Sequence, residues 1–187
     1  MRVGLGIDTH QLVPGKSIRL GGVDIPSNVS IKAHSDGDII YHAVADSILG
    51  AIGGGDIGDH FPDTDPNNKD LDSAVIVNLA INKALLMNLI LNNLDITLML
   101  DSPKISQYKV KMTANLVEIF SSAYYEHYMK LIKRTQSPSN KEEQVKILTN
   151  YIADNMFNIK ASTSESLGFI GKGQGVTCYC IASFKDL

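Results

Sequence analysis

Hydrophobic and polar positions alternate with two different periods along the chain, and the changes of period predict a succession of strands and helices. Apolar side chains at every second position predict strands at 2–9, 17–25, 31–33, 94–100, 158–162 and 176–184. Apolar stripes at the helical period predict helices at 38–52, 73–91, 106–133 and 145–156. Because strands and helices are mixed and short turns favour antiparallel hairpins, the pattern predicts an α+β fold.

Three stretches follow neither period. Residues 56–69 are rich in Asp, Pro and Asn, and residues 167–175 are rich in glycine, so both are predicted to be loops. The stretch RTQSPSNKEE, residues 134–143, is polar and contains a proline, which is typical of a surface insertion. We therefore predict a single domain over 1–187 with a polar insertion near 125–155.

The overall composition argues against nucleic acid and membrane surfaces as partners. The chain has 187 residues, a hydrophobic fraction of 44% and a net charge of −3. No global positive field is therefore available to attract a polyanionic surface. An anionic small molecule would need local positive charge, from a metal ion or from well-placed lysines.

The start of the chain and its cysteines bear on the compartment. MRVGLGIDTH is too short and too polar to be a signal peptide, so we expect that any targeting segment was removed or lies outside this sequence. Frequent Asn, Ile and Lys favour the stroma of a plastid-type, apicoplast-like organelle, with a bacterial cytoplasm as the alternative. Cys178 and Cys180 share one face of a predicted strand, which is poor geometry for a disulfide, so we expect two small buried residues in a reducing compartment.

Two segments carry groups that bind metal ions. Asp8 and His10 are two residues apart at a strand end, so their side chains leave the strand on one face. His42 lies on one stripe of the first predicted helix, together with Asp38 and Asp46. One carboxylate and two imidazoles suit a zinc-type ion with an open fourth position. The alternatives are a solvated strand-end turn for the first pair and a core or surface histidine for His42.

The entry to this helix also has two interpretations. Ser35 or Asp36 is predicted to cap it, and the backbone amides of His34 and Ser35 either face an anion or complete an ordinary cap. The helical spacing lets either Asp38 or Asp46 orient the imidazole of His42. We favour Asp46 as the residue that orients an active-site group, and Asp38 as the residue that serves the helix start.

The loops contain further polar groups. The aspartates of GDIGDHFPDTDP either bind the hydroxyls of a polyol or form Asx-turns in solvent. Residues 162–165 and 168–175 offer hydroxyls, an acid and a lysine, but their order matches neither a Walker A loop nor a dinucleotide fingerprint. The plainer interpretation of these residues is a glycine-rich connection that binds no ligand. Lys104, after Pro103, is in the same way either a ligand-binding residue or a solvated lysine at a strand end.

Together these segments resemble one family, the 2-C-methyl-D-erythritol 2,4-cyclodiphosphate synthases of the non-mevalonate isoprenoid pathway. The resemblance runs through GIDTHQL, IRLGGVDIP, AHSDGDIIYHAVADSILG, GDIGDHFPDTDP, DSPK and STSESLGFIGKGQG, and it fails between about residues 124 and 155. It implies a mixed, mostly antiparallel sheet with helices packed on one face. It also implies a homotrimer around a central β core, with active sites between subunits.

The resemblance further implies the site residues. One divalent, zinc-type ion per subunit is expected at Asp8, His10 and His42, and a second ion, Mg or Mn, at Glu165. His34 and Thr163 are the expected catalytic residues. The residues expected to bind substrate are Asp8, Thr9, His10, His34, Ser35, Asp56, Ile57, Gly58, Phe61, Pro62, Asp63, Thr64, Asp65, Leu100, Lys104, Ile105, Ser106, Ser162, Thr163, Ser164, Glu165, Phe169 and Lys172.

The implied reaction needs no protein nucleophile. In 4-diphosphocytidyl-2-C-methyl-D-erythritol 2-phosphate, the 2-phosphate attacks the β-phosphorus of the diphosphate and CMP leaves, so the enzyme is a phosphorus–oxygen lyase. Two ions with Lys104 and Lys172 would offset the repulsion between the phosphates. Two rivals share the metal ligands: a zinc phosphohydrolase that uses water, and a module whose zinc is structural and has four protein ligands. Neither explains DSPK and STSE together.

Overall fold

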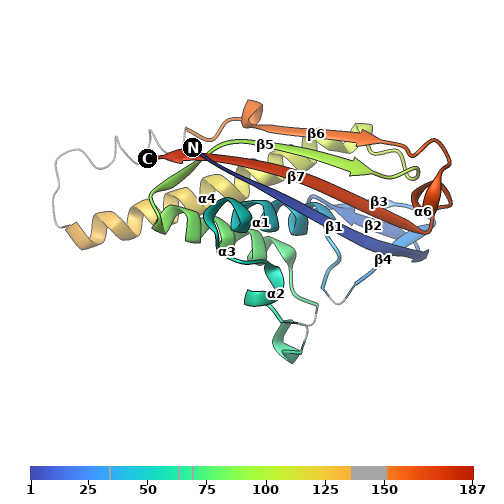
Figure 1. Cartoon of the computed structure of the whole chain (residues 1–187), viewed down its shortest axis with the longest axis horizontal. Helices are drawn as coiled ribbons and strands as arrows, with labels where there is room; N and C mark the ends of the chain where they lie inside the picture. Colours follow the sequence, from blue (N-terminus) through green and yellow to red (C-terminus); the bar gives the residue numbers. More distant parts are fainter. Residues whose placement is uncertain (34, 63, 69, 136–150) are drawn as a thin grey trace.

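The strands of the protein are arranged mainly in one sheet, with the order β4-β1-β7-β5-β6 (Figure 1). The computed structural model describes residues 1–33, 35–62, 64–68, 70–135 and 151–187. Within them, β5 and β6 pair in parallel and the other neighbours pair antiparallel, which confirms the predicted mixed sheet. The five strands are β1 (Arg2–Pro14), β4 (Val29–Lys32), β5 (Leu89–Met99), β6 (Phe157–Ser162) and β7 (Gly175–Asp186).

Helices cover one face of this sheet, as Figure 1 shows for α1, α3 and α4. The helix α1 packs on β1 and β7, and α3 contacts both α1 and α4. The predicted α+β class is confirmed. None of the helices in the described residues is long and apolar enough to cross a membrane. The α-helices are α1 (Ile39–Ile52), α2 (Ile57–His60), α3 (Ser73–Leu86), α4 (Lys109–Thr135) and α6 (Gly168–Gly171), and the 3-10 turns are η1 (Pro66–Asn68), η2 (Ser106–Tyr108) and η3 (Asp154–Met156).

The predicted strand at 17–25 is instead a two-stranded hairpin of β2 (Ser17–Leu20) and β3 (Val23–Pro26). Gly21 and Gly22 form its turn with φ angles of 57° and 72°. Two consecutive positive φ angles suit the tight turn that matches the twist of a hairpin, and glycine adopts them without strain.

The predicted helix at 73–91 ends early. Helix α3 stops at Leu86, and Asn88 takes a left-handed φ of 56°. Asparagine tolerates this conformation better than most residues. Leu89 and Leu91 are buried and pair with β7, so the last part of the apolar run is the start of β5. Apolar periodicity alone could not separate the two elements.

Several predicted boundaries change in the loops. The stretch 56–69 contains α2 and η1, and 167–175 contains α6, because short helical turns satisfy backbone groups that an open loop would leave to water. The third predicted helix begins with η2 and continues to Thr135 as α4. Of the predicted insertion near 125–155, residues 125–135 belong to α4 and 136–150 lie outside the described residues. Half of the predicted helix at 145–156 also lies outside them, and its described end holds the 3-10 turn η3. The single domain with an insertion stays a prediction.

Close contact between β1 and α1 depends on two glycines. A Cβ atom at Gly6 would lie 2.0 Å from the carbonyl oxygen of Ala43, and one at Gly4 would lie 2.0 Å from that of Ser47. The backbone of α1 therefore rests directly on the backbone of β1. This contact brings the first turns of α1 close to the part of β1 that carries Asp8 and His10.

Both cysteines are buried on the same side of β7, as the sequence predicts. Cys178 and Cys180 are free thiols with no exposed surface, and Ser47 of α1 donates a hydrogen bond to the sulfur of Cys180. They fill the interface between β7 and α1 as small core residues.

Candidate metal centre and substrate pocket

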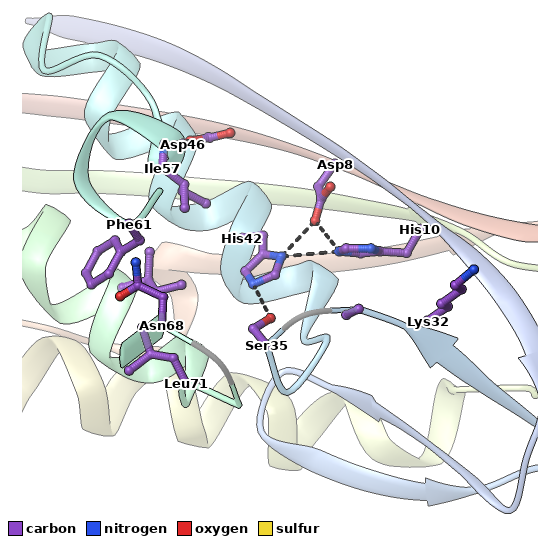
Figure 2. A pocket seen from close by; sticks show the side chains of 12 residues that line it. Asp8, His10, Lys32, Ser35, His42, Asp46, Ile57, Phe61, Asn68 and Leu71 are labelled. Atoms are coloured by element: carbon purple, nitrogen blue, oxygen red, sulfur yellow. Dashed lines mark hydrogen bonds and ion pairs between the residues drawn. The ribbon is translucent and has the colours of Figure 1, made fainter. Parts of the chain in front are cut away.

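Three side chains from β1 and α1 meet at the centre of the candidate site (Figure 2). Asp8 Oδ2 lies 2.9 Å from His10 Nε2 and 2.9 Å from His42 Nδ1, and the two ring nitrogens are 3.3 Å apart. Asp8 and His10 lie on the same face of β1 as Gly4 and Gly6. The helix that rests on these glycines therefore brings His42 to them.

The three groups strongly influence one another's ionisation. Burial alone would raise the pKa of Asp8, but hydrogen bonds from His10 and His42 outweigh it and hold the pKa well below its usual range. Burial alone would lower the pKa of His42, but the hydrogen bond with Asp8 outweighs it and raises the pKa above the ordinary value of 6.5. The carboxylate is thus ionised at neutral pH, as a metal ligand must be.

This donor set fits a divalent metal ion. The ligand atoms of Asp8, His10 and His42 all lie within 4.8 Å of one another, and all three residues are partly buried. They form the one such group of three or more ligands among the described residues. Three protein ligands with an open position are typical of a catalytic zinc-type site and unlike the closed, four-ligand set of a structural zinc.

We expect the affinity of the site for Zn²⁺ to rise with pH. In the metal-free protein, the raised pKa of His42 favours a proton on the ring, and a metal ion at Nδ1 must displace that proton. The dissociation constant should fall by up to about tenfold per pH unit below the pKa of His42 and level off above it. Competition with a chelator at a series of pH values measures this.

The control for this pH dependence is His60→Ala. His60 contacts the carbonyl oxygen of Gly54 with its Nε2 and lies outside the group of candidate ligands, so its removal should leave the profile unchanged. An affinity that does not vary between pH values below and above 6.5 would show that His42 gives up no proton to the metal.

The three candidate metal ligands line a pocket of about 310 Å³ (Figure 2). Ser35, Ile57 and Phe61, three of the residues expected to bind substrate, line it. His34 and Asp63 lie outside the described residues. Among the described residues of the same loops, the predicted Asp56, Gly58, Pro62, Thr64 and Asp65 do not line it.

Asp56 and Thr9 have other contacts. Asp56 caps α2, because its side chain accepts a hydrogen bond from the amide of Asp59 while the Asp59 side chain accepts from the amide of Asp56. The hydroxyl of Thr9 lies 3.0 Å from that of Thr177 on β7, on the opposite face of β1 from Asp8. Their predicted part in substrate binding stays untested.

Several residues of this pocket were missed by sequence reasoning. Lys32 ends β4 and places an ammonium group at the rim, as Figure 2 shows. Its exposed strand-end position gives no signal in the sequence. Ser73, which is buried behind the pocket and does not line it, was missed as well, and its hydroxyl lies 2.8 Å from His42 Nε2. Other lining residues that the sequence did not indicate are Ala33, Asn68, Leu71 and Ile76.

A second pocket of about 170 Å³ lies at the ends of β5 and β6. The two pockets have no lining residue in common, so within one chain the segments DSPK and STSE do not join the metal ligands. Lys109 and Ala161 also line this pocket and were not predicted. The predicted residues that line it are Leu100, Lys104, Ile105, Ser106, Ser162 and Thr163.

The turn after β6 is held by one aspartate. Asp101 accepts a 2.9 Å hydrogen bond from the amide of Ser164, and Glu165 accepts a 2.8 Å hydrogen bond from the hydroxyl of Thr163. Glu165 is exposed and has a positive φ of 52°. Phe169 is half exposed in α6, and Lys172 lines a third pocket with residues that include Leu12 and Asp101.

The two helix acids have separate roles. Asp46 accepts a 2.9 Å hydrogen bond from the amide of Ile57, which fixes the start of α2 beside the pocket, and its favoured part in orienting an active-site group stays a prediction. Asp38, and not Ser35 or Asp36, caps α1. Neither acid contacts the imidazole of His42. Asp8 and Ser73 contact it instead.

We expect Asp38→Ala to destabilise the fold. The fully buried carboxylate accepts hydrogen bonds from the amides of Gly21, Gly22 and Tyr41 at 2.8, 2.6 and 3.2 Å. Each buried donor left without an acceptor costs roughly 1–3 kcal/mol, so the free energy of unfolding should fall by at least about 2 kcal/mol in urea denaturation. Asp24→Ala, at an exposed carboxylate of β3, should cost less than about 0.5 kcal/mol. Equal losses would contradict the capping role.

The chain is similar in sequence to known proteins over nearly its whole length. Residues 1–136 match the model of the YgbB family. The 2-C-methyl-D-erythritol 2,4-cyclodiphosphate synthase of Pelobacter propionicus is 35% identical over 181 residues, 97% of this chain and 96% of the relative. That of Geobacter metallireducens is 37% identical over 182 residues, with the same coverage.

The fold is also similar to those of solved structures. The bifunctional IspDF from Campylobacter jejuni superposes with a TM-score of 0.79 and 31% identity, over all of this chain and 42% of that chain. A CDP complex of IspF from Plasmodium falciparum superposes with a TM-score of 0.73 and 30% identity, over 99% of this chain and 96% of that chain.

Proposed function

The chain belongs to the YgbB family, and we propose that it converts 4-diphosphocytidyl-2-C-methyl-D-erythritol 2-phosphate to 2-C-methyl-D-erythritol 2,4-cyclodiphosphate and CMP at the pocket around Asp8, His10 and His42. The observation that carries the proposal is the convergence of these three ligands beside an open pocket. Relatives named for this reaction are similar over almost the whole chain, so the enzyme acts in isoprenoid biosynthesis by the non-mevalonate pathway.

The proposed reaction is an intramolecular displacement at phosphorus, in which one phosphorus–oxygen bond forms and another breaks. An oxygen of the 2-phosphate forms a bond to the β-phosphorus, and the bond from that phosphorus to the oxygen shared with the α-phosphate breaks. The electron pair leaves with CMP, so no protein nucleophile is required. Holding the two ends together can contribute about 7–11 kcal/mol in favourable cases.

A divalent ion at Asp8, His10 and His42 would supply positive charge for the phosphoryl oxygens. The chain's own residues then orient the substrate. Lys32 adds a cation at the rim of the same pocket, and Ser35 adds a hydroxyl. We propose a zinc-type ion here, and a second ion, Mg or Mn, at Glu165, whose exposed carboxylate stands beside Thr163.

The second pocket suits the nucleotide end of the substrate. Lys104 and Lys109 provide positive charge, and Ser106, Ser162 and Thr163 provide hydroxyls. Thr163 and His34 are proposed to stabilise the transition state. The IspF structure in complex with CDP, at 30% identity over nearly the whole chain, supports a site for a cytidine nucleotide in this fold.

We further propose a homotrimer whose subunits meet at the face of the sheet that carries no helices. Outward-facing apolar residues lie there on β1 and β7, each between 41% and 57% exposed: Val3, Leu5, Ile7, Tyr179 and Ile181. Such a patch on a sheet face favours burial against another chain. A neighbour could then bring its nucleotide pocket to the metal ligands of this chain, which one chain does not do by itself.

The organisms of the similar proteins bear on the compartment in which this protein works. The curated relatives compared are bacterial proteins, which is consistent with the alternative of a bacterial cytoplasm. The IspF structure of Plasmodium falciparum is about as similar, at 30% identity. We propose the bacterial cytoplasm ahead of a plastid-type organelle.

Incubation of the purified protein with the cytidylylated substrate and a divalent metal tests the reaction. Phosphorus NMR should show CMP and a cyclic diphosphate appearing in equal amounts. Release of inorganic phosphate would instead identify a zinc phosphohydrolase and overturn the proposal.

A further inference from the structure

His42 has a second set of contacts on the side of its ring that faces away from Asp8 and His10. Its Nε2 lies 2.8 Å from the hydroxyl of Ser73, the first residue of α3, and 3.2 Å from that of Ser35. Ser73 is fully buried, and the side chain of His42 is 12% exposed. In such a contact either the ring nitrogen or the hydroxyl supplies the proton, and the direction decides which nitrogen stays free.

Asp36 sets the direction of the Ser73 hydroxyl. The hydroxyl donates a short hydrogen bond to Asp36 Oδ1, and the amide of Ser73 donates to Asp36 Oδ2 at 3.2 Å. An ionised carboxylate can only accept hydrogen bonds. The single proton of the hydroxyl is therefore committed to Asp36, and a lone pair of its oxygen faces His42 Nε2.

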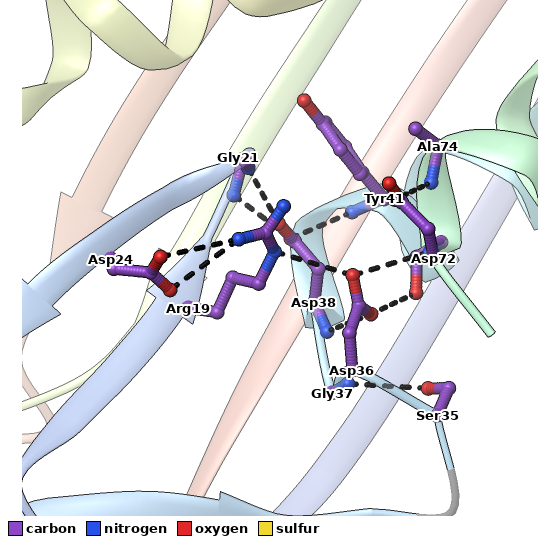
Figure 3. A network of polar contacts seen from close by, with 12 residues as sticks. Arg19, Gly21, Asp24, Ser35, Asp36, Gly37, Asp38, Tyr41, Asp72 and Ala74 are labelled. Carbon is purple, nitrogen blue, oxygen red and sulfur yellow. Dashed lines mark hydrogen bonds and ion pairs between the residues drawn. The ribbon is translucent and has the colours of Figure 1, made fainter. Parts of the chain in front are cut away.

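Arg19 completes the chain of contacts. Its Nε lies 3.2 Å from Asp36 Oδ2, and its other end pairs with Asp24, as Figure 3 shows. The amide of Asp38 also donates to Asp36 Oδ1, at 3.1 Å. The hydrogen bonds of the Asp36 carboxylate with Ser73 and Asp38 are thus all with donors, and Arg19 adds an ion pair without a hydrogen bond. This surrounding matches a group that only accepts hydrogen bonds.

We propose that Ser73 and Asp36 are positioning residues that keep a proton on Nε2 of His42, so that Nδ1 is the nitrogen that gives up its proton to the metal ion. The inference rests on the metal site of the proposed function. Nδ1 is the nitrogen that lies 2.9 Å from Asp8 Oδ2 and 3.3 Å from His10 Nε2, so the chain of contacts presents the correct atom to the site. Outer partners of this kind are typically worth 10–100-fold in metal affinity.

The Ser73 hydroxyl is not needed to start α3. Asp72 is the cap of that helix, and its side chain accepts a 2.9 Å hydrogen bond from the amide of Ala74. The hydroxyl of Ser73 instead links Asp36, just before α1, to the ring of His42, which lies 31 positions earlier in the chain than Ser73. Its geometry serves the imidazole and not the end of its own helix.

The test measures Zn²⁺ affinity and the position of the proton, without any turnover. Chelator competition on the full chain should give a dissociation constant about 10–100-fold weaker for Ser73→Ala than for the unchanged protein. Nitrogen-15 NMR of histidine-labelled, zinc-loaded protein should show the unchanged His42 protonated at Nε2. Ser47→Ala is the matched control, because this buried serine of α1 bonds to Val44 and Cys180 and not to His42.

Asp36→Asn gives the sharper variant. Of the donors that surround Asp36, only the hydroxyl of Ser73 can turn round and accept, so the new amide should donate to it. The hydroxyl then donates to His42 Nε2, and the proton of the ring moves to Nδ1, where it competes with the metal. We expect weaker zinc binding here too, and a combination with Ser73→Ala that adds little further loss, because both changes break one chain.

The outcomes separate this inference from the function on which it rests. If the unchanged protein binds no Zn²⁺ at Asp8, His10 and His42, the proposed metal site is wrong. If it binds zinc but Ser73→Ala and Asp36→Asn both stay within about twofold of it, the positioning role alone is wrong. Should either variant fail to fold, the NMR of the unchanged protein still decides, because zinc on Nε2 with a proton on Nδ1 overturns the inference.

Discussion

Replacing Asp8 with alanine is expected to lower the rate of CMP release by at least about a thousandfold while the protein stays folded. Asp8 is the one anionic member of the candidate ligand set, and hydrogen bonds from both histidines hold its pKa well below the usual range. Without it, two imidazoles hold the ion weakly. CMP release should be followed by chromatography, and bound metal by elemental analysis of the purified variant.

His42→Ala should have the same effect, because it removes a ligand from the other element of the site. The matched control is Asp186→Ala, which removes an exposed carboxylate near the end of β7 and should leave metal content and turnover unchanged. Near-normal turnover in either ligand variant would show that the metal assignment is wrong. Loss of the folded state, measured by circular dichroism, would show that these residues serve the fold.

The candidate metal ligands could be predicted because two local periods decide which side chains share a face. Asp8 and His10 follow from the period of a strand, and the place of His42 follows from that of a helix. What brought the two segments together in the prediction was the resemblance to a family. In the structure, the same result has a physical cause in the backbone contact at Gly4 and Gly6, which no local pattern reveals.

Residues that act through distant contacts were beyond prediction. Ser73 reads as an ordinary first residue of a helix, and Asp36 as a possible cap, yet Ser73 contacts both Asp36 and His42 once the chain is folded. The exposed Lys32 likewise reaches the pocket through the pairing of β4 with β1. Asp38 was placed correctly at a helix start, but its two strongest partners, Gly21 and Gly22, come from a hairpin that was predicted as one strand.

Gly6→Ala is expected to damage both the fold and the site, because one methyl group would force β1 and α1 apart. Its Cβ would lie 2.0 Å from the carbonyl oxygen of Ala43 and 2.6 Å from the amide of Ser47, and neither backbone atom can turn aside. Overpacking of this kind costs roughly 1–3 kcal/mol, occasionally more. Because His42 lies in the displaced helix, a shift of about 1 Å could also cost a hundredfold in activity. Urea denaturation and Zn²⁺ titration measure the two effects.

Gly50→Ala makes the same chemical change at the same interface and should have the opposite sign. A Cβ atom there would lie 3.8 Å from the Cα of Gly4, an ordinary contact, and the position is inside α1. Alanine is favoured over glycine by up to about 1 kcal/mol in a helix interior, so this variant should be as stable as the unchanged protein or more so. If both variants lose stability equally, then glycine is needed along this interface for flexibility. If only Gly6→Ala loses stability and zinc affinity together, the close approach of the two backbones is what places His42 beside Asp8 and His10.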